Sequence, residues 1–285
     1  MPTNRETYFH LINKQNKYLT RLVVKSLLED ANGFVGPMDL YKYFDMECQN
    51  YDVLMSKAER IENGEPFQYV LGYANFIDRF FKVTPDVLIP RQETEQLVIN
   101  VKSMIESGFK KDAPIVIADV ATGSGVIGIS LKRYFPNAIV YGTDIDEKAL
   151  EVAKENSLNL KEKVEFLQGN MLEPLIKQGI RVDVLVSNPP YIEGPETVDE
   201  QVLKYEPHKA LFASPATFFY EEILKHADEV LKPDGIMAFE IGEDMEEALI
   251  DVVYKYFPTA NIYFSKDIYH KTRFLYIIDK GEINS

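Results

Sequence analysis

The sequence predicts an α/β protein with a doubly wound, mainly parallel sheet of seven strands, preceded by a small helical domain. From Ile115 onward, short apolar segments typical of buried strands alternate with segments whose apolar residues recur at helical spacing. Such an alternation produces βαβ units with right-handed crossovers, and therefore a parallel sheet covered by helices. Residues 1 to about 65 show only the helical pattern, which separates them from the α/β region.

The individual elements follow from this periodicity. We expect strands over residues 115–119, 139–144, 164–167, 182–187, 236–240, 262–264 and 274–278. Helices are expected over residues 126–134, 148–156, 218–231 and 245–256, and another through Leu97 and Ile105. The last two strands have no helix between them, so they should form an antiparallel hairpin at one end of the sheet.

The N-terminal region predicts three helices. Apolar residues recur at helical spacing from Tyr8 to Leu27 and the pattern ends near Gly33, which predicts one helix over this stretch. Pro37 is expected to open a short second helix, since proline is favoured at the first helical position. Asp52 is a candidate N-cap for a third helix, and Gly64 is a stop signal at its end.

A hairpin is expected to link the helical and the α/β regions. Residues 76–83 predict two short strands around a turn at Asp78-Arg79. We therefore expect an N-terminal helical domain at residues 1–73, a β-hairpin linker at 74–91 and a catalytic domain at 92–285. The helical domain carries no recognisable chemistry, which leaves substrate recognition as its expected role.

The composition favours a cytoplasmic globular protein. Although 46% of the 285 residues are hydrophobic, no apolar run approaches the roughly 20 residues that span a bilayer. The N-terminal segment lacks the apolar centre of a signal peptide, and a single cysteine, Cys48, excludes an internal disulfide. The scattered histidines predict no metal site. A formal net charge of −14 disfavours phosphate backbones, so we expect no direct nucleic-acid binding and no membrane partner.

A glycine-rich segment follows the first predicted strand. It consists of Ala121, Thr122, Gly123, Ser124 and Gly125. Glycines allow a ligand to approach the backbone closely, and Asp144, at the end of the next strand, can accept hydrogen bonds from both hydroxyls of a ribose. The segment has neither the lysine of a P-loop nor the first glycine of a dinucleotide motif. S-adenosylmethionine, which contains a ribose but no pyrophosphate, fits this pattern best.

The segment Asn188-Pro189-Pro190-Tyr191 follows a short apolar strand, at the edge where α/β sheets bind ligands. The two prolines cannot donate N–H groups, so they end the strand and restrict the loop. The Asn188 side-chain oxygen and the Pro189 carbonyl can accept both N–H groups of a planar amide, and Tyr191 can stack on it. This arrangement predicts methyl transfer to a planar nitrogen by orientation and electrostatics, without a strong general base.

Taken together, these motifs resemble those of class I S-adenosylmethionine-dependent methyltransferases, which have a Rossmann-like sheet. More closely, nearly the whole chain resembles the bacterial peptide chain release factor N(5)-glutamine methyltransferases. The resemblance lies in Val87-Leu-Ile-Pro-Arg-Gln-Glu-Thr-Glu95, Thr122-Gly-Ser-Gly125, Asp144, Val186-Ser-Asn-Pro-Pro-Tyr-Ile192, Glu206-Pro207 and Glu240-Ile-Gly242. The first of these segments is the specific one, since Asn-Pro-Pro-Tyr alone does not separate glutamine from adenine methylation.

The resemblance implies an activity and a cofactor site. The activity is methylation of the glutamine side-chain amide in the Gly-Gly-Gln motif of translation release factors. Residues 121–125 would hold the methionine part of the cofactor and Asp144 its ribose. Asn170 and Met171 would flank the adenine.

The resemblance also implies a substrate site beside the cofactor. Asn188 would touch both cofactor and substrate, and it would act with Pro189 and Tyr191 in catalysis. Pro190 and Glu206 would contact the substrate. The rim residues Arg91, Glu93 and Glu95 would either brace the site or form a plain salt-bridge network.

The sequence departs from this family at several positions. Ala121 replaces the first glycine of the loop and would crowd the methionine end unless its φ is negative. Asn170-Met171 replaces an Asp-aromatic pair, and Phe212 to Thr217 contain no glycine. The alternatives are a glutamine methyltransferase for a ribosomal protein, an adenine-N6 methyltransferase for nucleic acid, and an inactive cofactor-binding protein.

Overall fold

The computed structural model describes residues 1–33, 39–110 and 114–278. The chain forms two compact units. One consists of residues 1–73 together with residues 199–205, and the other of residues 74–198 together with residues 206 onward. Nothing in the sequence pattern indicated that residues 199–205 group with the N-terminal helices.

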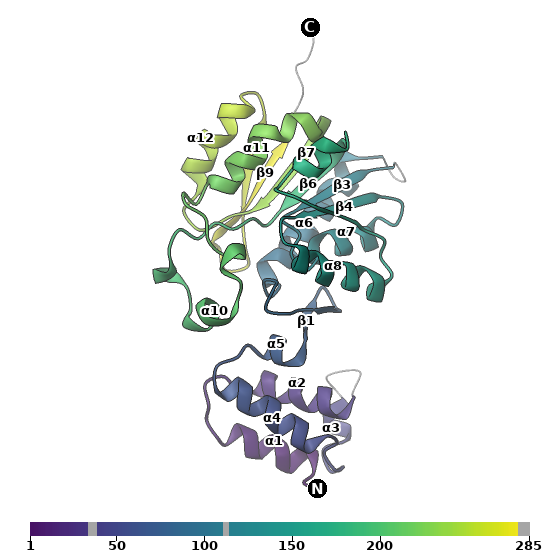
Figure 1. Ribbon diagram of the computed structural model, residues 1–285, viewed down its shortest axis with the longest axis vertical. Helices are drawn as coiled ribbons and strands as arrows, with labels where there is room; N and C mark the ends of the chain where they lie inside the picture. The colour runs from purple at the N-terminus through teal and green to yellow at the C-terminus, as the bar shows by residue number, and fades with distance from the viewer. Residues whose placement is uncertain (34–38, 111–113, 279–285) are drawn as a thin grey trace. The chain divides into compact units, whose positions relative to one another are not determined.

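The smaller unit consists mainly of helices (Figure 1). Its helices are α1 (Asn4–Ile12), α2 (Arg21–Asn32), α3 (Asp39–Lys42), α4 (Tyr51–Glu62), α5 (Phe67–Leu71) and α10 (Glu200–Tyr205). Apolar side chains of α1, α2 and α4 form its core, including Leu11, Leu27 and Leu54. Helix α10 is joined to this unit by Gln201, whose Nε2 donates to the Gly64 carbonyl at 2.9 Å.

Two expectations for this unit were wrong. The single helix expected from residue 8 to near Gly33 is two helices, because Thr20 caps α2 by accepting a hydrogen bond from the backbone N–H at the third helical position, while α2 ends as expected at Gly33. Asp52 lies inside the first turn of α4, whose N-cap position is held by Asn50. The helix start expected at Pro37 lies outside the described residues.

The larger unit contains the predicted seven-stranded sheet, with the order β5-β4-β3-β6-β7-β9-β8 (Figure 1). The strands are β3 (Val116–Val120), β4 (Ile139–Asp144), β5 (Glu165–Gln168), β6 (Val182–Ser187), β7 (Leu231–Glu240), β8 (Asn261–Lys266) and β9 (Thr272–Ile278). β3 to β7 pair in parallel, and β9 lies antiparallel between β7 and β8. The doubly wound fold and the terminal antiparallel hairpin are therefore confirmed.

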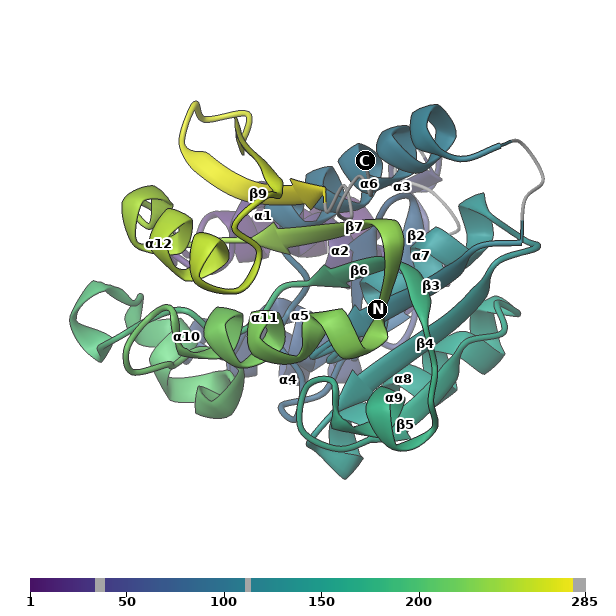
Figure 2. The same ribbon diagram turned by 90° about the horizontal axis from the view of Figure 1, so that it is seen from above.

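Helices cover both faces of this sheet (Figure 2). They are α6 (Gln92–Gly108), α7 (Val126–Tyr134) and α8 (Glu147–Leu160), then α9 (Glu173–Lys177), α11 (Phe218–Val230) and α12 (Glu246–Tyr256). Strand β6 is apolar on both faces because it separates two cores. Leu185 packs with α11 and α12, whereas Val184 and Val186 pack with α6 and α7.

A two-stranded hairpin, β1 (Tyr73–Phe76) and β2 (Arg79–Lys82), precedes α6. Its turn is at Ile77-Asp78, one residue earlier than expected, because both residues adopt positive φ (45° and 59°), as a two-residue hairpin turn requires. Glu95 favours this placement, since its Oε1 accepts the Ile77 N–H at 3.0 Å. Asn156 of α8 binds the backbone of β2 at Lys82 and also donates to the Ser124 carbonyl at 2.9 Å.

Candidate active site

Three loops meet at the point in the sheet where the strand order changes direction, between β3 and β6. Strand β3 pairs with β4 on one side and with β6 on the other, so that Val120 lies opposite both Thr143 and Ser187. Because the three strands are parallel, the residues that follow them leave the sheet at one edge. Ligands of open α/β sheets bind at this kind of position.

The glycine loop after β3 is held against the sheet. The Thr122 N–H donates to the Thr143 carbonyl at 2.9 Å. Gly123 and Gly125 have φ values of 54° and 83°, and a Cβ added at Gly125 would lie 2.9 Å from Ile129 Cδ1. The start of α7 therefore favours glycine at position 125, because any side chain there would be strained and would crowd Ile129.

Asp119 supports this loop from inside the protein. It is fully buried, and its Oδ2 accepts hydrogen bonds from the Thr122 hydroxyl at 2.5 Å and the Gly128 N–H at 2.9 Å. Among the described residues its Oδ1 has no hydrogen-bond partner. Burial raises the pKa of Asp119 to about 7, since the ionised form loses its hydration.

Replacing Asp119 with asparagine is expected to change how stability depends on pH. In the folded state the raised pKa means that Asp119 retains its proton up to about pH 7, whereas the unfolded chain releases it near its ordinary value of 3.8. Wild-type stability should therefore fall across this range by roughly 4 kcal/mol relative to the Asp119→Asn variant. Urea unfolding of both proteins at several pH values measures the difference, and a pH-independent difference would contradict it.

Ala121 adopts a left-handed conformation, with φ of +58°. The condition under which alanine would fit without strain, a negative φ, is therefore not met. Its side chain lines the cavity described below.

An Ala121→Gly variant is expected to be more stable by up to ~1 kcal/mol, because a left-handed alanine is strained and glycine is not. Thermal or urea unfolding measures the change. The matched control is Ala149→Gly, in helix α8 and also lining the cavity. This variant should be less stable by about 1 kcal/mol, because glycine is unfavourable inside a helix. Equal losses in both variants would contradict the strain at position 121.

Asp144 ends β4 and lines the cavity. Its Oδ2 accepts the Gly123 N–H at 2.9 Å, and its Oδ1 accepts the Asp146 N–H at 3.0 Å. Burial raises the pKa of Asp144, an effect that is opposed by hydrogen bonds from the backbone of Gly123 and Ile145 and by the charge of the nearby Lys209. Each carboxylate oxygen keeps a further lone pair for a ligand hydroxyl.

Asn170 and Met171 also line the cavity, at the turn between β5 and α9. Met171 has a positive φ of 43°, and its carbonyl accepts the Thr143 hydroxyl at 2.9 Å. This hydrogen bond fixes the turn to β4 beside Asp144. Met171 and Ile145 provide apolar side chains in this part of the cavity.

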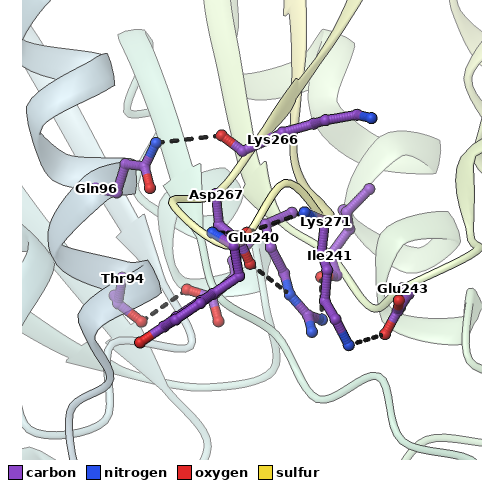
Figure 3. Close-up of polar contacts among 10 residues, drawn as sticks. Thr94, Gln96, Glu240, Ile241, Glu243, Lys266, Asp267 and Lys271 are labelled. Atoms are coloured by element: carbon purple, nitrogen blue, oxygen red, sulfur yellow. Dashed lines mark hydrogen bonds and ion pairs between the residues drawn. The ribbon is translucent and has the colours of Figure 1, made fainter.

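The Asn188 side chain is fixed from two neighbouring elements. Its Nδ2 donates to the hydroxyl of Thr94, on α6, at 3.1 Å. Thr94 in turn donates to Glu240 Oε2 at 2.7 Å (Figure 3). Glu240 ends β7 and is close to Asn188 because Phe239 pairs with Ser187 in the sheet. The sequence singled out the segments of Thr94 and Glu240 but gave neither residue a role.

Glu206 is buried and accepts hydrogen bonds at both of its carboxylate oxygens. The donors are the Ile89 N–H at 3.0 Å and the Arg91 guanidinium at 2.6 Å. Glu206 thus joins the segment before α6 to the chain that follows the Asn188 loop. In this arrangement its carboxylate braces the rim, and Arg91 is the residue of the pair that lines the cavity.

The cavity has a volume of about 300 Å³. Of the residues predicted from the sequence, it brings together Ala121, Thr122, Gly123, Ser124, Asp144, Asn170, Met171, Asn188 and Pro190. The others lie outside its lining: Gly125 begins α7, Pro189 is buried, Tyr191 packs against the core beside α11, and Glu206 braces the rim. Residues that sequence reasoning missed include Phe212 and Phe219, which add aromatic surface, and Lys209, which pairs with Asp146.

The described residues, 1–33, 39–110 and 114–278, show neither a candidate metal site nor a membrane-spanning helix. These residues contain no cluster of three or more His, Cys, Asp or Glu side chains placed to hold a metal ion. No helix among them combines the length and the apolar character needed to cross a membrane.

The chain is similar to known proteins in sequence and in fold. Residues 102–206 match the family model described as Methyltransferase small domain. A Staphylococcus aureus protein named release factor glutamine methyltransferase is 39% identical over 213 residues, which are 74% of each chain. A Bacillus subtilis protein of the same name is 35% identical over 259 residues, covering 90% of this chain and 86% of the relative.

Among solved structures, the catalytic domain of hMettl16 in complex with an RNA hairpin superimposes with a TM-score of 0.51 at 14% identity. The match covers 79% of this chain and 81% of that domain. At this identity the likeness concerns the fold alone.

Proposed function

Because this chain belongs to the release factor glutamine methyltransferase family, we propose that it methylates the side-chain amide of the glutamine in the Gly-Gly-Gln motif of translation release factors. The observation that carries this proposal within the structure is the fixed Asn188 side chain, at the carboxyl end of β6 and on the wall of the cavity. Release factors act in the cytoplasm, so we place the reaction there.

S-adenosylmethionine is the proposed methyl donor, and it supplies an activated methyl group on a sulfonium sulfur. The cavity fits such a molecule. Asp144 offers carboxylate lone pairs for the ribose, and no atom lies within 4 Å of a Cβ position at Gly123, which leaves room along the loop for the methionine part. Ile145 and Met171 offer an apolar site for the adenine.

The protein's own contribution is to orient the acceptor amide. The two N–H groups of the glutamine amide donate to the Asn188 side-chain oxygen and the Pro189 carbonyl, which sets the nitrogen in one direction. Two acceptors on these N–H groups also favour the positive charge that develops at nitrogen, and one N–H proton then leaves to solvent. Tyr191, the last residue of the loop, is partly buried against the core and so anchors the loop.

The experiment that tests this function combines the protein with a purified release factor and S-adenosylmethionine. Peptide mass spectrometry should find the mass of one added CH₂ on the Gly-Gly-Gln glutamine. The matched control is a release factor in which this glutamine is replaced by alanine. If no increment forms although calorimetry shows that the cofactor binds, the proposed function is wrong.

Parallel reactions with ribosomal proteins and with RNA or DNA test the alternatives. The net charge of −14 favours a protein acceptor over a polyanion, since unlike charges are needed to bind phosphate backbones. We therefore expect methylation of the release factor and none of the nucleic acids.

A further inference from the structure

Two buried polar side chains, Thr94 and Glu240, lie behind the Asn188 loop and form a hydrogen-bonded chain with the partly buried Asn188. Thr94 and Glu240 have relative exposures of only 3% and 2%, and they come from α6 and β7. Figure 3 shows the Thr94 hydroxyl pointing at the Glu240 carboxylate. Such groups are costly to bury unless their hydrogen bonds are complete, so their arrangement has few alternatives.

The number of available protons determines the direction of each hydrogen bond. A threonine hydroxyl has one proton, and Thr94 donates it to Glu240 Oε2 at 2.7 Å. The Thr94 oxygen is then only an acceptor towards Asn188, 3.1 Å away, so the nitrogen of the Asn188 amide must face it. The Asn188 oxygen consequently points away from Thr94 and is free to accept a substrate N–H.

We propose that Thr94 and Glu240 are positioning residues for methyl transfer, and that the Glu240 carboxylate sets the Asn188 amide in the orientation that accepts the substrate N–H. This inference rests on the proposed function for its catalytic consequence, but the orientation itself is a property of the protein alone. Neither residue touches the reacting atoms, so both act through Asn188.

Protonation of Glu240 would reverse the chain. A carboxylic acid can donate to the Thr94 oxygen, which frees the Thr94 proton for the Asn188 oxygen. The Asn188 amide would then turn its nitrogen outward, and a nitrogen donor cannot accept a substrate N–H. The productive orientation therefore requires ionised Glu240.

The surroundings of Glu240 place its protonation, and with it the turn of the Asn188 amide, close to neutral pH. Burial raises the pKa of Glu240 to about 7, and Glu93 on α6 adds to the rise. The hydrogen bonds from Thr94 and Asn188, and the charge of Arg273 on β9, oppose it. Arg273 is itself paired with buried Asp267, at 3.4 Å between Nε and Oδ2, which limits its effect. Tyr191 and Tyr220 lie on the remaining sides of Glu240. The Tyr220 hydroxyl donates to the Glu240 backbone carbonyl.

The first measurement is steady-state turnover across pH for wild-type protein and variants. Glu240→Gln and Thr94→Val are each expected to lower kcat by roughly 100-fold, as misplacement of a reacting group by about 1 Å can do, with the KM for the cofactor changed by less than about 2-fold. In wild type, kcat should rise with pH through about 7, and Glu240→Gln should lose this dependence. Thr94→Ser, which keeps the hydroxyl, should restore most of the rate.

The matched control is Tyr276→Phe. It removes a part-buried hydrogen bond between α6 and the sheet, from Asn100 to the Tyr276 hydroxyl at 2.7 Å, and Asn100 lies further along α6 than Thr94. It should leave kcat and its pH dependence unchanged. A fall in kcat in Tyr276→Phe equal to that in Thr94→Val would show a general effect of packing and would overturn the proposal.

A second measurement does not depend on activity. The side-chain amide NMR signals of Asn188, identified by their loss in Asn188→Asp, should shift with a midpoint near pH 7 in wild type and stay constant in Glu240→Gln. Constant signals in wild type would overturn the proposal. If the signals shift as expected but no release factor is methylated, the positioning stands and the proposed function fails. If Glu240→Gln does not fold, the Thr94→Val and Thr94→Ser pair decides the outcome.

Discussion

An Asn188→Ala protein is expected to bind S-adenosylmethionine somewhat more weakly, because Asn188 lines the cavity, and to methylate a release factor at least ~100-fold more slowly. Removing one oriented group that stabilises the charge of a transition state costs about this much in other enzymes. The fold should survive, because Thr94 keeps its hydrogen bond to Glu240 and only the hydrogen bonds that the Asn188 amide donates to Thr94 and Glu240 are lost. Single-turnover methylation followed by mass spectrometry, with calorimetry of the cofactor, measures the two effects separately.

Asn188→Asp provides the sharper comparison for this prediction. It keeps an oxygen where the acceptor stands but replaces the amide nitrogen that donates to Thr94. A carboxylate beside Glu240 would also add a like charge to a buried site. Turnover should therefore remain low although an acceptor is present. Near-normal rates in either variant would mean that Asn188 does not orient the substrate amide.

Two buried carboxylates, Asp119 and Glu240, are expected to make the stability of the fold decrease with pH, while ionisation of Glu240 is expected to raise the proposed activity. Burial raises the pKa values of Asp119 and Glu240 to about 7. Below this pH both are neutral and their burial costs little, whereas above it each is an ion without full hydration. For Glu240, the ionised form is the one that orients Asn188, so the protein should be less stable in the pH range where it turns over fastest. Strain of this kind is common at functional sites.

The sheet and the position of Asn188 could be predicted because local pattern determines them. Strand β6 is apolar on both faces, and the two prolines end it, so Asn188 had to lie at the carboxyl edge of a central strand. Asp144 ends a neighbouring strand by the same reasoning. The alternation of strands and helices then placed both residues at one edge of the sheet.

Features that depend on contacts between distant segments could not be predicted. Thr94 and Glu240 are 146 residues apart in sequence, and only the register of β6 with β7 brings Glu240 next to Asn188. Periodicity likewise continued across the break between α1 and α2, because the loop between these helices contains Leu19, a core residue at helical spacing. The left-handed backbone of Ala121 has no signal in its residue type.

The role of Glu206 could not be predicted for the same reason. Its sequence position suggested a substrate contact, but its two oxygens accept hydrogen bonds from Ile89 and Arg91, more than a hundred residues earlier in the chain. A carboxylate held at both oxygens in this way orders the segment leading into α6. Helix α10, immediately before Glu206, belongs to the smaller unit, so the covalent path from the Asn188 loop to Glu206 runs through that unit.

Replacing Asp144 with alanine is expected to weaken binding of S-adenosylmethionine at least ~100-fold, the second large effect. The proposed contact is a carboxylate that accepts two ribose hydroxyls, and hydrogen bonds to a charged group are worth roughly 1.5–3 kcal/mol each. The substitution also releases the Gly123 N–H from its partner, which loosens the glycine loop. Isothermal calorimetry of the cofactor gives the dissociation constant, and Asp251→Asn, an exposed position on α12, controls for the loss of one negative charge.

A cofactor analogue without ribose hydroxyls separates these two contributions. Wild-type protein should bind the analogue at least ~100-fold more weakly than S-adenosylmethionine, whereas Asp144→Ala should bind both with nearly equal affinity, because the group that distinguishes them is gone. If Asp144→Ala binds the analogue more weakly than wild type does, that difference measures the effect of the loosened glycine loop. If Asp144→Ala discriminates between the two ligands as strongly as wild type does, the ribose is bound elsewhere in the cavity and Asp144 acts only through Gly123.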